Sequence, residues 1–231
     1  MTKSVAETIV HLEQIIRQKY DPMGFIDAQH GAYKTGHVPH VAPLAYLCIR
    51  YAGLDDVEID KAESECDRYI PEPYRELLRH MNGARMLGVS LLGGIGGSVD
   101  RSAIGIGQPI SLRYQNAIGR PDYIPNGHLG IGAINGPWFS QGHLYLTSTG
   151  EVELYNARFN MIGARWPSLA VFLEDELSRR FSIYDDEGRI LENAKLLPGD
   201  TDDWERLAQG AKEEKAKKSL LGHVVNALRR K

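Results

Sequence analysis

Cysteine and long apolar runs are the first things this sequence lacks. Only two cysteines, Cys48 and Cys66, occur among 231 residues, too few for a disulfide framework. Both lie in apolar or amphipathic stretches, so we predict two reduced, mostly buried thiols. No uncharged apolar stretch approaches the roughly 18 residues that a membrane-spanning helix needs. The first residues also lack the basic and apolar regions of a signal peptide, so we expect a soluble, cytoplasmic protein.

A dominant charge is also missing. The formal net charge is −3, with 42% hydrophobic and 25% charged residues, as in ordinary globular domains. Proteins that bind specific nucleic acids usually present a basic face or domain, and the balance of the whole chain neither favours nor excludes one. The length allows one large domain, or one domain with extensions. We expect no nucleic-acid partner.

Motifs that bind phosphate are absent. The run Gly93–Gly97 suggests a phosphate cradle, but the chain contains no Gly-Lys pair, which a P-loop requires. Gly105-Ile106-Gly107 and Gly130-Ile131-Gly132 both lack the third glycine of a dinucleotide fingerprint. These glycines are better interpreted as turns or bulges.

Metal sites and nucleophiles are not indicated either. His37 and His40 lie close in sequence with Cys48 nearby, but the paired spacing of a structural zinc site is missing. There is no Gly-x-Ser-x-Gly elbow, although the sequence leaves open a cysteine and a histidine that meet in space. The acid pairs Asp185-Asp186 and Asp202-Asp203 lie in charged stretches typical of a solvated surface. We predict no metal, no cofactor and no enzymatic activity.

Helical patterns dominate the first part of the chain. Ser4 and Glu7 form a capping box before an apolar stripe, which predicts a helix over 4–19. Further helices are predicted over 44–53, 57–68 and 71–81, with Gly53 and Gly83 as left-handed terminating residues. Glycines and prolines interrupt residues 20–42, which we interpret as either an ordered loop or a mobile arm.

Strand patterns dominate the next part. Fifteen of the 24 glycines fall between Gly83 and Gly150. Short β-rich runs alternate with turn signals and predict strands over 104–106, 110–112, 129–134, 143–148 and 152–155, with a hairpin turn at 148–151. A helix is predicted over 167–181, with Pro167 in its first turn. Helices followed by strands indicate an α+β fold with an antiparallel sheet packed against helices.

An ordered set of motifs resembles the SUKH superfamily, also called the Smi/Knr family. Glu63 lies eight residues before Pro71, followed by an aromatic-leucine helix and Asn82-Gly83. Later motifs similar to those of the family are Tyr123–Gly127 with Leu129–Gly132, Leu144–Thr147 with Gly150–Tyr155, and Trp166–Leu173. Residues 93–97 are richer in glycine than the family's pattern at this position. The resemblance spans residues 57–181.

The resemblance implies a domain organisation and a role. We expect an N-terminal helical extension over 1–56, a SUKH-like domain over 57–184 and a charged C-terminal extension over 185–231. Bacterial members of the family are mostly immunity proteins that neutralise toxins, often nucleases or deaminases, and eukaryotic relatives regulate cell-wall synthesis and signalling through protein contacts. The family has no established catalytic residues, and its motif residues, here Pro71, Gly83, Trp166 and Phe172, are expected to be architectural.

The C-terminal extension carries opposite charges in its two parts. Residues 185–205 hold eight acidic and two basic residues, and residues 211–231 hold seven basic and two acidic residues. Apolar residues at helical spacing predict a basic amphipathic helix near the end: Leu220, Leu221, Val224, Val225 and Leu228. This helix could pack on its own domain, form a homo-oligomer contact, enter a partner's groove or lie on an anionic membrane.

Three functions follow from these patterns. The first is an immunity protein that binds and neutralises a toxin domain; the second is a regulator or scaffold that acts through protein contacts; the third is an unrecognised hydrolase. Binding residues concentrate on loops and favour arginine and aromatic side chains. By that criterion the candidate contact residues are Arg113, Tyr114, Asn116, Arg120, Trp138 and Phe139, each of which could equally be packed or solvated.

Overall fold

The computed structural model describes residues 3–27, 32–94, 109–135, 140–156 and 161–198. Its helices are α1 (Val5–Tyr20), α2 (Asp56–Cys66), α3 (Glu72–His80) and α4 (Leu169–Phe181), with short helical turns η1 (Asp21–Met23) and η2 (Tyr114–Ile118). Its strands are β1 (Phe25–Asp27), β2 (Tyr33–His37), β3 (Tyr46–Ala52), β4 (Met81–Met86), β5 (Val89–Leu91), β6 (Leu129–Asn135), β7 (Ser140–Leu146), β8 (Val152–Asn156) and β9 (Met161–Trp166).

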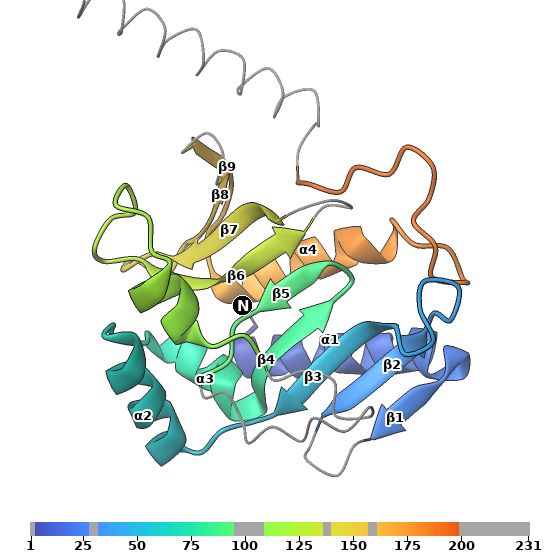
Figure 1. Ribbon diagram of the computed structural model, residues 1–231, viewed down its shortest axis with the longest axis horizontal. Coiled ribbons are helices and arrows are strands. Elements are labelled where there is room, and N and C mark those ends of the chain that lie inside the picture. Colours follow the sequence, from blue (N-terminus) through green and yellow to red (C-terminus); the bar gives the residue numbers. More distant parts are fainter. Residues whose placement is uncertain (1–2, 28–31, 95–108, 136–139, 157–160, 199–231) are drawn as a thin grey trace, which may run out of the picture.

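All nine strands form one antiparallel sheet in chain order, from β1 to β9. One register row crosses the whole sheet and contains Ile26, Lys34, Ile49, Arg85, Ser90, Ala133, His143, Tyr155 and Ile162. The α+β class and the antiparallel sheet are confirmed. Figure 1 shows α1 and α4 behind the sheet, with α2 and α3 at its lower left.

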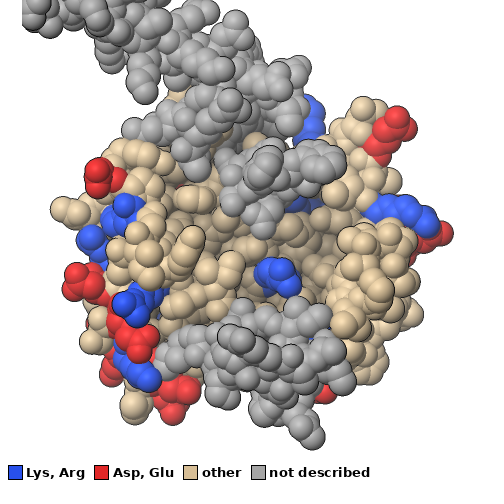
Figure 2. Space-filling view, viewed as in Figure 1, with Lys and Arg blue, Asp and Glu red and all other residues tan. Residues whose placement is uncertain are grey.

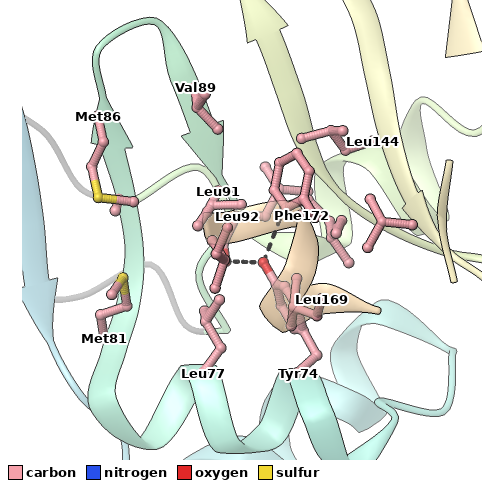
Figure 3. Close-up of a cluster of buried hydrophobic side chains, with 14 of the residues drawn as sticks. Tyr74, Leu77, Met81, Met86, Val89, Leu91, Leu92, Leu144, Leu169 and Phe172 are labelled. Carbon is pink, nitrogen blue, oxygen red and sulfur yellow. Dashed lines mark hydrogen bonds between the residues drawn. The ribbon is translucent and has the colours of Figure 1, made fainter. Parts of the chain in front are cut away.

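A single large core lies between the sheet and the helices. Phe172 of α4, Leu77 of α3 and Leu144 of β7 are all fully buried in it. Tyr74 is also fully buried, and its hydroxyl lies 2.7 Å from the Leu92 carbonyl and 3.0 Å from the Ile131 carbonyl, as Figure 3 shows. Tyr74 therefore connects α3 to two segments of the sheet while it fills the core.

The predicted helices 4–19, 57–68, 71–81 and 167–181 are confirmed, with small shifts at their ends. Ser4 caps α1 and forms the predicted box with Glu7. Ser168 caps α4, so Pro167 precedes the helix instead of lying in its first turn. The expected packing of Trp166 and Phe172 is present, with an edge-to-face distance of 4.9 Å between ring centroids.

The predicted helix over 44–53 is wrong, because these residues form β3. Short apolar runs fit a buried strand as well as a buried helix, and pairing with β2 and β4 decides between them. Cys48 faces the helical core, whereas Ile49 belongs to the row on the opposite face. Gly53 does not end a helix: it leaves space for the Arg79 carbonyl, which would lie 1.9 Å from an added Cβ.

Residues 1–56 are more than a helical extension. They supply three strands, β1, β2 and β3, of which β3 pairs with β4 across the expected boundary at residue 56. Helix α1 packs on α3 and α4, and its buried face includes Ile9, Leu12 and Ile16. The expected SUKH-like segment therefore shares its sheet and core with the preceding residues.

Asn82 and Gly83 have a different role from the one expected. Helix α3 ends at His80, and Gly83 lies inside β4 with φ +78°. An added Cβ there would lie 2.8 Å from the Gly93 nitrogen, while the Asn82 side chain accepts a hydrogen bond from the Gly94 nitrogen at 2.8 Å. The pair therefore fixes the start of the glycine-rich run against β4.

The remaining strand predictions have mixed outcomes. Strands over 129–134, 143–148 and 152–155 are confirmed as β6, β7 and β8. The predicted turn at Gly150 joins β7 to β8. Residues 110–112 do not form a strand and contribute only a single parallel bridge between Gly93 and Ser111. The predicted strand 104–106 lies outside the described residues, as does the amphipathic helix near the C-terminus. Strands β1, β2, β4, β5 and β9 were not predicted.

Candidate partner-binding surface

The segment that contains η2 is held firmly beside β6. We call residues 111–128 the η2 loop. Asn116, only 2% exposed, donates hydrogen bonds to the carbonyls of Leu112 and Gly130 and accepts one from the Gly130 nitrogen, all between 2.7 and 2.9 Å. Gln115 is also buried and donates to the Leu144 carbonyl. Both amides therefore bind backbone groups of the sheet and fix the position of η2.

The second half of the η2 loop packs on the face of the sheet opposite the helices. Ile124 is buried in a small apolar cluster with Tyr145 and Tyr155. Tyr123 stacks on Tyr155 with ring centroids 6.4 Å apart, and Tyr145 meets Tyr155 edge to face at 5.3 Å. Burial of these aromatic side chains stabilises the loop in one conformation.

A polar cluster closes the end of the η2 loop. His128 Nε2 lies 3.1 Å from Oε2 of Glu153, whose other oxygen accepts a hydrogen bond from Arg165 Nε at 2.9 Å. Glu153 is buried on β8. Burial, together with the neighbouring Glu153 carboxylate, raises the pKa of Tyr155 to about 12. The carboxylate is thus held between two nitrogen donors and ties the loop to β8 and β9.

Exposed apolar and basic side chains project from this fixed loop. Tyr114 is 62% exposed and Ile118 is 65% exposed, although both belong to η2. Tyr123 is partly exposed beyond its stacking contact, and Arg113 is exposed. Figure 2 shows blue side chains, with red ones beside them, among tan ones on the side of the molecule where η2 lies. Large apolar side chains on a constrained backbone are typical of recognition surfaces.

The connection between α2 and α3 extends this surface. Arg68 donates from Nη1 to the Asn126 carbonyl of the η2 loop at 3.0 Å, and the next residue, Tyr69, is 73% exposed. Arg120 donates from Nη2 to the adjacent Pro125 carbonyl. We use the name η2 surface for a set of exposed and half-buried side chains: Arg68, Tyr69, Arg113, Tyr114, Ile118, Arg120 and Tyr123.

The candidate contact residues from the sequence have three different outcomes. Arg113 and Tyr114 are exposed, and Arg120 is half-buried at the surface. The expectation of an exposed side chain is wrong for Asn116, because its amide is satisfied internally by the backbone. Trp138 and Phe139 lie outside the described residues.

Four residues of the η2 surface were not predicted. Ile118 and Tyr123 are apolar residues in a polar loop that fit no helical or strand period, and this misfit was the available signal. Arg68 and Tyr69 lie between two helices, where no local pattern distinguishes a surface residue from a buried one. Only tertiary contact between α2 and η2 brings them to the same surface.

Metal-binding clusters and exposed thiols are absent from the described residues. No group of three or more His, Cys, Asp or Glu side chains there could hold a metal ion. Both cysteines are free and buried. Burial raises the pKa of the Cys48 thiol to about 12 and also raises that of Cys66, which keeps these thiols protonated and unreactive at neutral pH.

A cleft lies between α1 and strands β2 to β4. Its lining includes Arg17, Tyr33 and Arg50. The Arg17 guanidinium lies 4.2 Å from the Tyr33 ring centroid, and Arg50 forms an ion pair with Glu13 at 3.0 Å. These polar groups already bind one another. We therefore interpret the cleft as a feature of the packing between α1 and the sheet and not as a binding site.

Comparisons with known proteins identify no family. No protein-family profile matches the chain, and no curated protein is similar enough to be a relative. Among the described residues, the helices are too short or too polar to cross a lipid bilayer.

Proposed function

We propose that this chain is a SUKH-type protein-binding domain that neutralises a toxin domain by direct binding, without catalysing a reaction. The observation that carries the proposal is the η2 surface, with tyrosine, isoleucine and arginine side chains on an anchored backbone. Tyrosine and arginine are enriched among residues that dominate binding energy. An anchored backbone also lowers the entropy lost when a partner binds.

The structural roles of the family-like motif residues support the SUKH part of the proposal. Glu63 accepts a hydrogen bond from the Ile70 nitrogen at 2.8 Å and so connects the end of α2 to the start of α3. Tyr74 and Asn82 bind backbone groups of the sheet and its connections. Such architectural roles fit a family whose motifs specify a fold and not a catalytic centre.

The test is neutralisation of a toxin domain encoded beside the gene for this chain. We expect the purified full chain to form a stable complex with that domain and to restore growth of cells that express it. The double variant Tyr114→Ala/Ile118→Ala should weaken the complex by about tenfold or more, because each removes a large exposed side chain from the contact.

Val10→Ala is a matched control, since Val10 is half exposed on α1, away from the η2 loop. It should bind as tightly as the parent chain. If no neighbouring toxin domain binds or is neutralised, the immunity role is wrong. If the double variant binds as tightly as the control, the contact lies elsewhere on the molecule.

A regulator or scaffold is the second candidate, favoured by the long extension after α4. A chain ending at Pro198 separates the two roles, because it keeps all described residues and removes 199–231. A core-domain inhibitor should still bind its toxin, whereas a scaffold that uses the extension should lose its partner.

A further inference from the structure

Two arginines of the η2 surface lie next to each other. Arg68 and Arg120 donate to the carbonyls of Asn126 and Pro125, which are consecutive residues. They come from the α2–α3 connection and the η2 loop, 52 positions apart in sequence, and are brought together by folding. Burial, and next the charge of Arg68, lowers the pKa of Arg120. We call these two residues the arginine pair.

The arginine pair has no carboxylate partner among the described residues. Neither guanidinium is within 4.0 Å of a carboxylate there, and the same holds for Arg113 of the η2 surface. Most other described arginines do form ion pairs: Arg50, Arg75, Arg79, Arg165, Arg179, Arg180 and Arg189. Two adjacent like charges are unfavourable unless an anion compensates them, and the described part of the chain supplies no such anion.

We propose that the arginine pair receives an aspartate or glutamate side chain from an acidic segment of a protein partner. The planar fork of a guanidinium matches a carboxylate, and two forks can hold its two oxygens. Tyr69, Ile118 and Tyr123 lie within three positions of these arginines in sequence and are exposed, so they offer apolar contact to the residues on either side of that acid. The proposal deepens the proposed function, on which it rests, by naming the chemistry of the partner.

A polyanion such as RNA fits this surface less well. Asp67 and Asp122 lie one and two positions from the arginines in sequence and are exposed, so they repel a long phosphate backbone. A peptide segment whose acidic residues alternate with apolar ones brings fewer negative charges to this surface than a phosphate backbone of equal length, so it is repelled less by these acids. The exposed Ile118 also favours a protein segment, since it offers no hydrogen bond to a phosphate.

The experiment uses the full chain and a fluorescent peptide of alternating Glu, Leu, Asp and Tyr residues. A second peptide carries Gln and Asn in place of the acids, and a single-stranded RNA of equal length is the third probe. We expect the acidic peptide to bind and the amide peptide to bind about tenfold or more weakly. Affinity for the acidic peptide should also fall with added salt.

Arg68→Gln/Arg120→Gln should reduce the affinity for the acidic peptide by about tenfold, while Arg68→Lys/Arg120→Lys should retain part of it. Lys61→Gln is the matched control, because Lys61 is an exposed cation on α2, and it should bind normally. Thermal unfolding of each variant shows whether it is folded. If the glutamine variant is unfolded, the salt dependence of peptide binding and the affinity of the lysine variant test the role of the arginine pair instead.

Equal binding of both peptides, binding of neither, or tighter binding of RNA would overturn the proposal. The toxin assay separates the two levels of inference. If the toxin is neutralised equally by the parent chain and by Arg68→Gln/Arg120→Gln, only the proposed role of the arginine pair is refuted. If the acidic peptide binds but no toxin is neutralised, the arginine pair stands and the immunity role fails.

Discussion

Single buried polar residues connect segments of this fold that lie far apart in sequence. Asn116 satisfies two backbone groups of Gly130, Tyr74 reaches two carbonyls outside α3, and Asn82 binds the Gly94 nitrogen. A buried polar group without a partner costs about 1–3 kcal/mol, so these residues specify a single arrangement. Asn116 also fixes the position of η2, from which side chains of the η2 surface project.

His143 is the residue whose protonation we expect to affect stability. It lies on β7 in the sheet face opposite the helices, its Nδ1 is buried without a hydrogen-bond partner among the described residues, and burial lowers its pKa below the usual value. The unfolded chain therefore binds a proton more readily than the folded chain. The contribution of His143 to stability is complete above an unfolded pKa of about 6.5 and is lost as the pH falls below it.

Urea unfolding at several pH values between neutral and mildly acidic measures this effect. The free energy of unfolding should fall less on acidification in His143→Gln than in the parent chain, because the other histidines contribute equally to both. Parallel curves for the two proteins would show that His143 is not the responsible group.

At the scale of elements, the residues after α4 belong to the folded domain. Leu197 is buried in the core, and Arg180 is buried against Glu176 with 2.8 Å between Nε and Oε1. Arg179 and Arg180 donate to the carbonyls of Lys195 and Leu196. The expected boundary at residue 185 therefore marks a change in the charge of the sequence and not the end of the folded domain. The packed structure continues to residue 198.

Truncation tests this assignment. A chain ending at Tyr184 should be destabilised by about 2–5 kcal/mol relative to one ending at Pro198, because it loses the buried leucine and the acceptors of two arginines. Chemical unfolding of both chains gives the difference. Equal stability would mean that the segment 185–198 contributes nothing to the fold.

At the scale of the whole molecule, one sheet joins the expected extension to the expected domain. A chain beginning at residue 57 loses α1 and β1 to β3, which exposes β4 as an edge and uncovers the surfaces of α3 and α4 that α1 buries. We expect it to lack a cooperative thermal transition, since much of the core would face water. The chain ending at Pro198 is the control, and a cooperative transition in residues 57–231 would support an independent domain.

Local chemistry determined much of what the sequence alone could predict. The capping box at Ser4, the stripe of α3 and the turn at Gly150 each depend on neighbours within a few residues, so their patterns predicted α1, α3 and the β7–β8 hairpin correctly. The predicted order of helices followed by strands indicated the α+β class correctly, although strands β1 to β3 in fact precede α2.

Tertiary structure decided the rest, because the deciding partners lie far along the chain. Residues 46–52 form a strand because β2 and β4 pair with them. Asn116 is buried because its side-chain amide donates a hydrogen bond to the Gly130 carbonyl. Residues 1–56 join the sheet through pairs that no local pattern encodes. The arginine pair exists only because α2 and η2 meet, so the chemistry of the η2 surface could not be derived from residue types alone.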